Sequence, residues 1–286
     1  MRSEIQTGVA ASERLLEARD RVLARVSYLR SEVGAREVVP IGTTPLDGEW
    51  MSCADLASNP EWLATIIAHT GRALGTDDQV VAASIFVQNY AYRIMTLAIA
   101  YATTSGVVPD AAAASMALSL KSGRPSNVAY VTPSAMILCE HADQATDALL
   151  DRVSERGALE FIIVRGLREH LALLVVGTRQ VVRIGQRLLW GNIAASCAVA
   201  FRTMEGSLGD WVRPLGERFF GDYAPELKGH GSFLALEVAG RRGWYWERTT
   251  CCLYDRLPGD IRCGDCSRTP VAQRRAAYRV SLEDAQ

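Results

Sequence analysis

Four of the seven cysteines of the chain lie within sixteen residues near its end, and this grouping constrains the fold and its chemistry more than any other feature. They are Cys251, Cys252, Cys263 and Cys266. Thiolates packed so densely repel one another and oxidise easily, so such a group usually binds a soft metal or an iron–sulfur cluster that absorbs its charge. We call residues 251–266 the cysteine segment and expect it to form a metal centre.

The two halves of this segment differ in the metal that they favour. Cys263 and Cys266 form an ordinary metal-binding knuckle, in which Gly264 allows a tight turn. Cys251 and Cys252 are adjacent, and adjacent side chains of an extended chain point to opposite faces, so binding one ion requires a local bend. A two-iron cluster accommodates such a pair more readily because its ligands are spread over two metal ions. The spacing leaves open a four-cysteine zinc site, an iron–sulfur cluster and disulfide bonds.

The sequence around these cysteines resembles a known family. Two adjacent cysteines, ten intervening residues and a Cys-x-x-Cys pair are similar to the C-terminal motif of the FhuF family of ferric-siderophore reductases. The flanking Arg248-Thr-Thr and the upstream stretch Leu188-Leu-Trp-Gly-Asn-Ile-Ala-Ala-Ser196 also resemble that family. The resemblance covers about the last hundred residues, whereas the first half resembles the family only in length and helical character.

This resemblance implies an activity and a cofactor. In that family the four cysteines ligate a 2Fe-2S cluster, which implies that Cys251, Cys252, Cys263 and Cys266 bind the cluster here and carry the electron. The chain is then expected to be a cytoplasmic ferric-siderophore reductase, an iron–sulfur oxidoreductase of iron uptake and homeostasis, which releases iron by one-electron reduction. The implied substrate is a ferric siderophore of hydroxamate type, and the implied donor resembles a ferredoxin. No nucleic-acid partner is expected.

Two other functions compete with this interpretation. A four-cysteine zinc protein could use its basic C-terminal end as a surface for nucleic acid or protein. A siderophore synthetase of the same superfamily is disfavoured, because the chain lacks room for the additional nucleotide-binding region. The colour of the protein separates the first two functions, since a 2Fe-2S protein is red-brown and a zinc protein is colourless.

Charge is distributed unevenly along the chain although its formal net charge is only −1. From residue 241 to residue 279 there are nine arginines and four acidic residues, a balance of +5. We expect this basic end to steer an acidic electron donor, through contacts with Arg262, Arg268, Arg274 and Arg275. The alternative is that these arginines only neutralise the thiolates of the metal centre.

Composition and the other cysteines indicate a globular protein in a reducing compartment. Hydrophobic residues make up 49% of the chain and the start lacks the pattern of a secretory signal, so we expect a cytoplasmic protein. An odd number of cysteines grouped for a metal also fits a reducing compartment better than a disulfide framework. Cys53, Cys139 and Cys197 lie singly among apolar or small residues and are expected to be buried.

Hydrophobic periodicity predicts an α+β fold, with a mainly helical body, a small β-sheet and the cysteine-rich segment at the C-terminus. We expect residues 1–240 to form the body and residues 241–286 to form the 2Fe-2S-binding segment. The predicted helices cover residues 12–36, 60–75, 79–104, 110–123, 143–156, 158–177 and 178–205. The predicted strands cover residues 127–132, 233–238 and 244–248.

Two of these helices carry residues of special interest. The helix over 79–104 is apolar enough to suggest a membrane span, but Gln88, Asn89 and Arg93 lie in its middle, which favours a buried central helix. In the helix over 178–205, a glycine precedes Asn192 and predicts a close backbone approach. Trp190 and Asn192 are candidates for shaping the substrate pocket or supporting the cluster, with ordinary core packing as the alternative.

Overall fold

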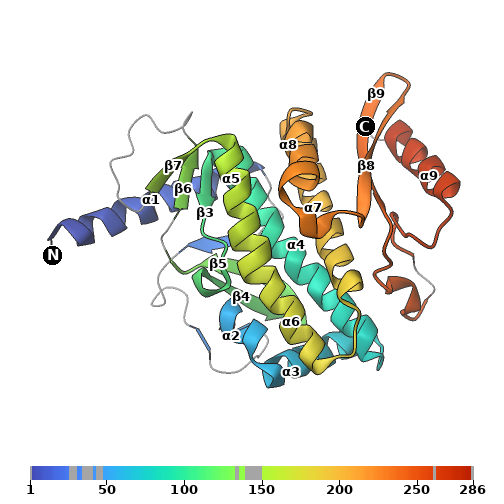
Figure 1. The fold of residues 1–286 in the computed structure, drawn as a ribbon, viewed down its shortest axis with the longest axis horizontal. Helices are drawn as coiled ribbons and strands as arrows, with labels where there is room; N and C mark the ends of the chain where they lie inside the picture. Colours follow the sequence, from blue (N-terminus) through green and yellow to red (C-terminus); the bar gives the residue numbers. More distant parts are fainter. Residues whose placement is uncertain are drawn as a thin grey trace.

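Two long helices form the centre of the fold in the computed structural model, which describes residues 2–25, 31–33, 41–42, 48–132, 135–138, 150–259 and 262–284. They are α4 (Gln79–Ser105) and α7 (Gln186–Leu208), which pack along each other (Figure 1). Helix α4 begins where the Asp78 side chain accepts hydrogen bonds from two backbone N–H groups, and it ends at Gly106 in a left-handed conformation. Most of its residues are buried, which confirms the predicted central helix.

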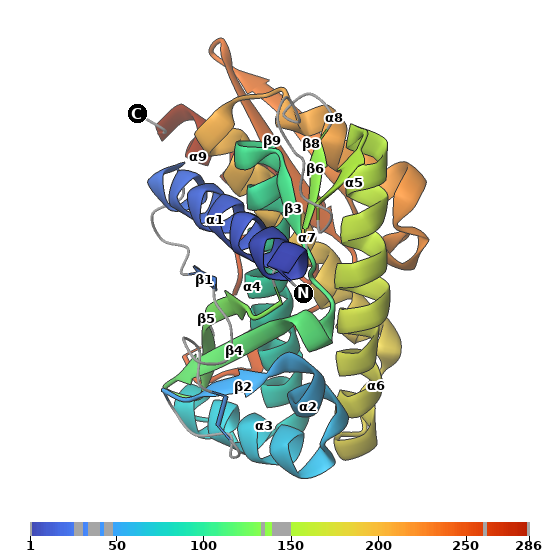
Figure 2. The same ribbon diagram turned by 90° about the vertical axis from the view of Figure 1, so that its left-hand side faces the viewer.

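Further helices cover the central pair. Helix α3 (Pro60–Leu74) follows α2 (Cys53–Ser58) and ends at the left-handed Gly75, close to the prediction. Helices α5 (Glu155–Ile162) and α6 (Ala172–Val181) form one column, joined by the π-helical turns Ile163–Leu171 (Figure 1). Helix α1 (Arg2–Arg25) crosses the other side of the body, as Figure 2 shows.

Two small sheets lie against this helical body. The first has the strand order β1-β5-β4-β2 and the second has the order β3-β6-β7, each with one parallel pair. Strand β5 confirms the prediction over residues 127–132. The bounds are Ser31–Val33 for β1, Trp50–Ser52 for β2, Val107–Pro109 for β3, Met116–Lys121 for β4, Arg124–Tyr130 for β5, Ala135–Leu138 for β6 and Leu150–Val153 for β7.

These sheets correct three helix predictions. Residues 110–123 form a short 3₁₀ turn at Ala113–Ser115 and strand β4 rather than a helix. The first five residues of β4 are all buried, and a strand buried on both faces shows no polar alternation to distinguish it from a buried helix. Residues 150–153 and 31–33 are likewise strands, at the ends of the predicted helices over 143–156 and 12–36. Residues 143–149, 26–30 and 34–36 of those predictions lie outside the described residues.

The C-terminal part is a β-hairpin covered by a helix. Strands β8 (Gly231–Val238) and β9 (Arg241–Arg248) pair antiparallel, which confirms both predicted strands. Their two-residue turn has positive φ at Ala239 and Gly240, as a tight hairpin turn requires. Helix α9 (Val271–Asp284) packs on the hairpin, which stands beside α7 and α8 (Val212–Arg218) in Figure 1. The mainly helical α+β fold with small sheets is therefore confirmed.

The apolar helix α4 does not resemble a membrane span in this structure. In the part of the chain that the structure describes, no helix combines the length and the apolar character that crossing a membrane requires.

Candidate metal centre

The hairpin leads directly into the cysteine segment, which lies at the ends of the central helices. Strand β9 ends at Arg248, and Cys251 and Cys252 follow after two threonines. Cys252 and Cys266 are buried, whereas Cys251 and Cys263 are partly exposed. The segment therefore lies at the boundary between the protein interior and the surface.

Cys252 and Cys263 are in direct contact. Their Sγ atoms lie 3.7 Å apart. Two thiolates bound at about 2.3 Å to one tetrahedral ion lie about 3.8 Å apart, so this pair has the spacing of two ligands of one ion. The backbone N–H of Cys266 donates a 3.1 Å hydrogen bond to the carbonyl of Cys263, which forms the predicted knuckle turn. Gly264 in that turn does not adopt a positive φ, so the turn does not depend on the conformational freedom of glycine.

Cys251 contacts other partners than this pair. Its Sγ accepts a 3.3 Å hydrogen bond from the N–H of Leu253 and lies 3.5 Å from Oδ1 of Asp255. Leu253 has a φ of 65°, so the chain bends directly after the adjacent cysteines. Among the described residues, no three Cys, His, Asp or Glu side chains converge to hold a metal ion. The structure thus brings together Cys252 and Cys263 and turns Cys251 toward Asp255.

The thiols of the touching pair differ in acidity. The hydrogen bond with Cys263 and the positive charge of Arg248 lower the pKa of Cys252 to about 6. The same hydrogen bond and burial raise the pKa of Cys263. Burial raises the pKa of Cys53 to about 12 and also raises that of Cys197, which makes both thiols inert and confirms that they are buried. Cys139 lies outside the described residues.

Arg248 brings a buried positive charge to this site. The residue is only 1% exposed, and its Nε donates a 2.7 Å hydrogen bond to the carbonyl of Thr250. Nη2 donates to Oδ1 of Asn192 at 2.8 Å, whereas Nη1 has no hydrogen-bond partner among the described residues and lies 4.0 Å from a carboxylate oxygen of Asp265. A buried charge without a close partner is costly. The touching thiols of Cys252 and Cys263, with an unused guanidinium donor near Cys252, therefore fit part of a metal–thiolate group with net negative charge.

Asn192 connects the arginine to both central helices. It is fully buried, and its Nδ2 donates to the carbonyl and Oγ of Ser84 at 2.9 and 2.8 Å. The Ser84 hydroxyl in turn donates a 2.7 Å hydrogen bond to the carbonyl of Cys252. Because its side chain is fully buried, Asn192 contacts the protein rather than solvent, and its role at the substrate pocket or the cluster stays a prediction. Through Ser84, Asn192 is linked to the backbone of Cys252.

Gly191 makes the predicted close approach. A Cβ atom at this position would lie 1.9 Å from Oγ1 of Thr250, far inside van der Waals contact. The neighbouring Trp190 is 8% exposed and lines a cavity of about 330 Å³ with Arg187, Lys228 and other residues. Trp190 therefore lines this cavity and not the larger cleft described next, and its role in a substrate pocket stays a prediction.

A cleft of about 500 Å³ separates the helical body from the C-terminal part. Gly264 and Asp265, which lie between the last two cysteines, belong to its wall. Polar side chains from α4 and α7 and aromatic side chains from β9 and α9 complete the lining; they include Gln88, Asn89, Tyr92, Arg202, Tyr245 and Tyr278. Sequence reasoning missed these residues as a group. The available signal was the polar pair Gln88 and Asn89 in an otherwise apolar helix.

The four arginines predicted to contact a donor have different environments. Arg262 is exposed, and Arg268 is exposed and paired with Asp255. Arg275 is partly exposed and forms two hydrogen bonds of 2.8 and 2.7 Å with Glu247. Arg274 is only 5% exposed, and its Nη1 donates to the carbonyl of Arg248 at 3.3 Å. This packing leaves little of the Arg274 side chain accessible, and its role in docking stays a prediction.

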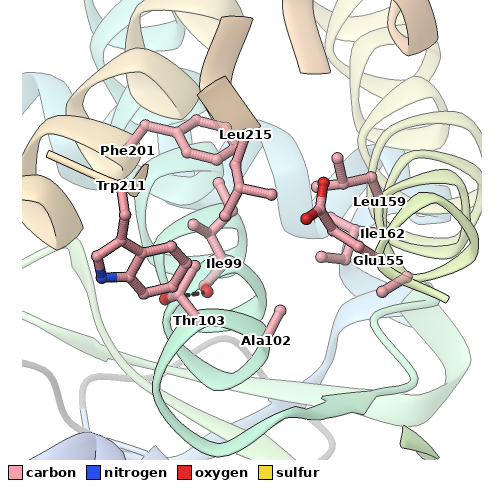
Figure 3. A pocket seen from close by; sticks show the side chains of 10 residues that line it. Ile99, Ala102, Thr103, Glu155, Leu159, Ile162, Phe201, Trp211 and Leu215 are labelled. Carbon is pink, nitrogen blue, oxygen red and sulfur yellow. Dashed lines mark hydrogen bonds between the residues drawn. The ribbon is translucent and has the colours of Figure 1, made fainter. Parts of the chain in front are cut away.

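A separate apolar pocket lies between α4, α5, α7 and α8 (Figure 3). Its lining includes Leu159, Phe201 and Leu215, with Trp211 at one side and the carboxylate of Glu155 at the other. None of its lining residues belongs to the cysteine segment. We therefore do not assign it to the metal centre.

A comparison of the sequence with protein families found a matching family. A family model described as ferric iron reductase FhuF-like transporter matches residues 84–241, which is more than half of the chain. The chain belongs to the FhuF family. The match begins at Ser84 and includes Asn192, but it ends before the cysteine segment. The family assignment therefore does not rest on the cysteines. No curated protein matches the sequence.

Two solved structures with a similar fold are of aerobactin synthetase. ATP-bound aerobactin synthetase IucA from a hypervirulent Klebsiella pneumoniae has a TM-score of 0.56 and 12% identity, over 76% of this chain and 44% of the synthetase. A second IucA structure from that organism has a TM-score of 0.55 and 10% identity, over 89% of this chain and 48% of the synthetase. The chain thus spans less than half the length of these enzymes. At this level of identity the similarity concerns the fold alone.

Proposed function

We propose that this protein is a ferric-siderophore reductase, which releases iron by transferring one electron to siderophore-bound Fe(III). The observation that carries the proposal is the cleft, because Gly264 and Asp265 in its wall lie between Cys263 and Cys266. A molecule in the cleft would therefore be next to the cysteines. The FhuF-family assignment supports a function related to ferric siderophores.

The four cysteines are proposed to hold a 2Fe-2S cluster, as the motif implies. Cys252 and Cys263 have the spacing of two ligands of one ion, and Arg248 supplies a buried positive charge beside them. Bound there, the cluster would supply one electron at a time, which is what the reduction of Fe(III) to Fe(II) requires. Cys251 would have to turn from Asp255 toward the other thiols.

The cleft offers suitable contacts for the substrate. Siderophores hold Fe(III) with hard oxygen ligands, and those ligands bind the reduced ion less tightly, so reduction leads to release. The amide groups of Gln88 and Asn89 and the guanidinium of Arg202 could hydrogen-bond such oxygens, while Tyr245 and Tyr278 offer aromatic surface. We propose a hydroxamate siderophore as the substrate, with its metal facing the wall at Gly264.

Electron entry is assigned to the basic surface near the cysteines. We propose that a ferredoxin-like donor contacts Arg262, Arg268 and Arg275, which lie outside the buried core. In this arrangement residues 1–240 serve as the substrate-binding body and residues 241–286 as the redox segment. The division falls at the turn of the β8–β9 hairpin. A reducing cytoplasm is the proposed location, since the thiols must remain reduced before metal binding.

A single-turnover experiment tests this function. Protein reduced under oxygen-free conditions is mixed with a ferric hydroxamate siderophore in the presence of a chelator specific for Fe(II). The proposal predicts that about one ferrous ion per protein appears as the visible spectrum returns to that of the oxidised protein. A protein that is reoxidised by oxygen but releases no ferrous iron from any ferric siderophore would not be a siderophore reductase.

A zinc protein is the second candidate, because the 3.7 Å separation of Cys252 and Cys263 fits zinc as well as iron. In that case the basic C-terminal end would bind nucleic acid or an acidic protein. The purified protein would then be colourless, contain zinc and bind nucleic acid with a strong dependence on salt.

A further inference from the structure

Arg248 lies where the hairpin, the two central helices and the cysteine segment meet. Its guanidinium uses two of its three nitrogens to bond Thr250 and Asn192, and the third has no hydrogen-bond partner among the described residues. Among the described residues, the carboxylate that forms an ion pair with Arg248 is that of Asp265, with Oδ2 at 4.0 Å from Nη1. The buried positive charge of Arg248 therefore acts on Cys252, while its ion pair with Asp265 is a long one of 4.0 Å.

We propose that Arg248, oriented by Asn192, is a positioning residue that raises the reduction potential of the group held by the cysteines. This inference rests on the proposed function, since it requires that the cysteines hold a redox group. Reduction adds one negative charge to that group. A fixed positive charge in an interior of low dielectric constant stabilises the more negative state, so the group accepts an electron more easily.

The Asn192 amide fits this role better than a carboxylate would. Its oxygen accepts the hydrogen bond from Arg248, while its nitrogen donates to the carbonyl and hydroxyl of Ser84. A carboxylate at this position could accept from Arg248, but it would neutralise the guanidinium. The neutral amide therefore fixes the orientation of the arginine and leaves its charge available to the cysteines.

Two further contacts make the arrangement rigid. Ser84 on α4 bonds the carbonyl of Cys252, so the same serine contacts both the cysteine backbone and Asn192. Thr250 is packed against Gly191 on α7 and also accepts the hydrogen bond from Nε of Arg248. Since the charge and the cysteine backbone are fixed to the same two helices, the distance between them is held constant.

The test compares reduction potentials in three variants. Asn192→Asp keeps the shape of the side chain but neutralises Arg248, and Arg248→Gln removes its charge. Arg242→Gln is the matched control, because Arg242 lies on the same strand but is exposed and paired with Glu237. Each protein is titrated with redox dyes, and its visible spectrum and iron content are recorded. Arg248→Lys serves as a rescue variant that restores the charge.

We expect Asn192→Asp and Arg248→Gln to accept electrons less readily than the wild type. The equilibrium constant for reduction should fall about tenfold or more, which corresponds to about 59 mV for a one-electron couple. Arg242→Gln should match the wild type, and Arg248→Lys should recover most of the difference.

Two results would overturn the inference while leaving the proposed function intact. One is a wild-type potential in an iron-loaded Asn192→Asp protein, which is decisive even if Arg248→Gln fails to fold. The other is an equal shift in Arg242→Gln, since that would reflect net charge rather than position. Absence of iron from the wild-type protein would instead refute the proposed function itself.

Discussion

Individual contacts beside the cysteines leave no room for larger side chains. Gly191 on α7 packs so closely on Thr250 that an added methyl group would overlap the threonine side chain. Neither partner can easily move, because Thr250 also accepts a hydrogen bond from the buried Arg248. The sequence predicted a close approach at this glycine but not its partner, which lies on a different element.

Gly191→Ala is therefore expected to destabilise the protein. Overpacking of a filled interior costs about 1 to 3 kcal/mol, which outweighs the gain of up to about 1 kcal/mol from replacing glycine in a helix. Gly206→Ala in the same helix is the control, since a Cβ there meets no atom within 4 Å and should stabilise the protein. Urea unfolding measures both changes. Equal stability of Gly191→Ala and the wild type would show that the loop moves freely.

The buried His170 should make the folding stability depend on pH. Its ring is fully buried, with Nδ1 bonded to the carbonyl of Ala111 at 2.9 Å and Nε2 bonded to the Tyr90 hydroxyl at 2.6 Å. Burial lowers its pKa from 6.5 to about 4. The unfolded chain therefore binds a proton below pH 6.5 that the folded protein excludes, so folding stability falls as the pH drops from about 6.5 to 4.

The loss across that pH range should be roughly 3 kcal/mol, since one pKa unit corresponds to about 1.4 kcal/mol. Denaturant unfolding at several pH values measures it, and His170→Gln should flatten the dependence in this range. If the variant retains the full slope, other groups account for the acid sensitivity.

At the scale of elements, local patterns predicted some segments well and others poorly. Helix α4 was predictable from its Asp78 cap, and the two hairpin strands were predictable from their aromatic and β-branched residues, although their turn lies at Ala239 and Gly240. Strands β4 and β7 were mistaken for helices, since burial of β4 within its sheet removes the alternation that identifies a strand. The four cysteines were grouped by their spacing, and their role as cluster ligands was implied by the family resemblance and stays a prediction. Their connection to Asn192 was not predictable, because Arg248 and Asn192 are 56 residues apart and meet only through tertiary packing.

The hairpin turn contains a position that can be improved. Ala239 has a φ of 50°, a left-handed conformation that costs about 1 to 2 kcal/mol for a residue with a Cβ atom. Ala239→Gly should therefore raise the unfolding free energy by about 1 kcal/mol. Ala235→Gly, at an exposed position within β8, should lower it by about 0.5 to 1 kcal/mol. Thermal unfolding compares the two variants, and destabilisation by both would mean that the turn does not retain this conformation in solution.

At the scale of the whole molecule, the cysteine segment borders the cleft of about 500 Å³ and lies near several exposed arginines. Gly264 and Asp265 line the cleft, whereas Arg268 and Arg275 remain accessible at the C-terminal end. Under the proposed function, an electron would enter from a protein donor near these arginines and leave to a molecule in the cleft. The +5 balance between residues 241 and 279 would attract an acidic donor.

Reversing Arg268 and Arg275 to glutamate should slow reduction by an acidic ferredoxin by about tenfold or more at low salt and flatten its salt dependence. Reduction by a neutral chemical donor should not change. Arg156→Glu is the control, because Arg156 is an exposed arginine on α5, in the helical body. Stopped-flow absorbance follows each reaction. Equal slowing with both donors would assign these arginines to the fold or the metal centre rather than to docking.

The most direct test of the account is the metal content of protein purified without oxygen, measured together with its visible spectrum. We predict a red-brown protein with about two iron and two sulfide ions per chain. Cys252→Ser and Cys263→Ser should lose this chromophore, whereas Cys53→Ser should retain it, because Cys53 is buried in the helical core. A colourless wild-type protein that contains zinc and no iron would contradict the account.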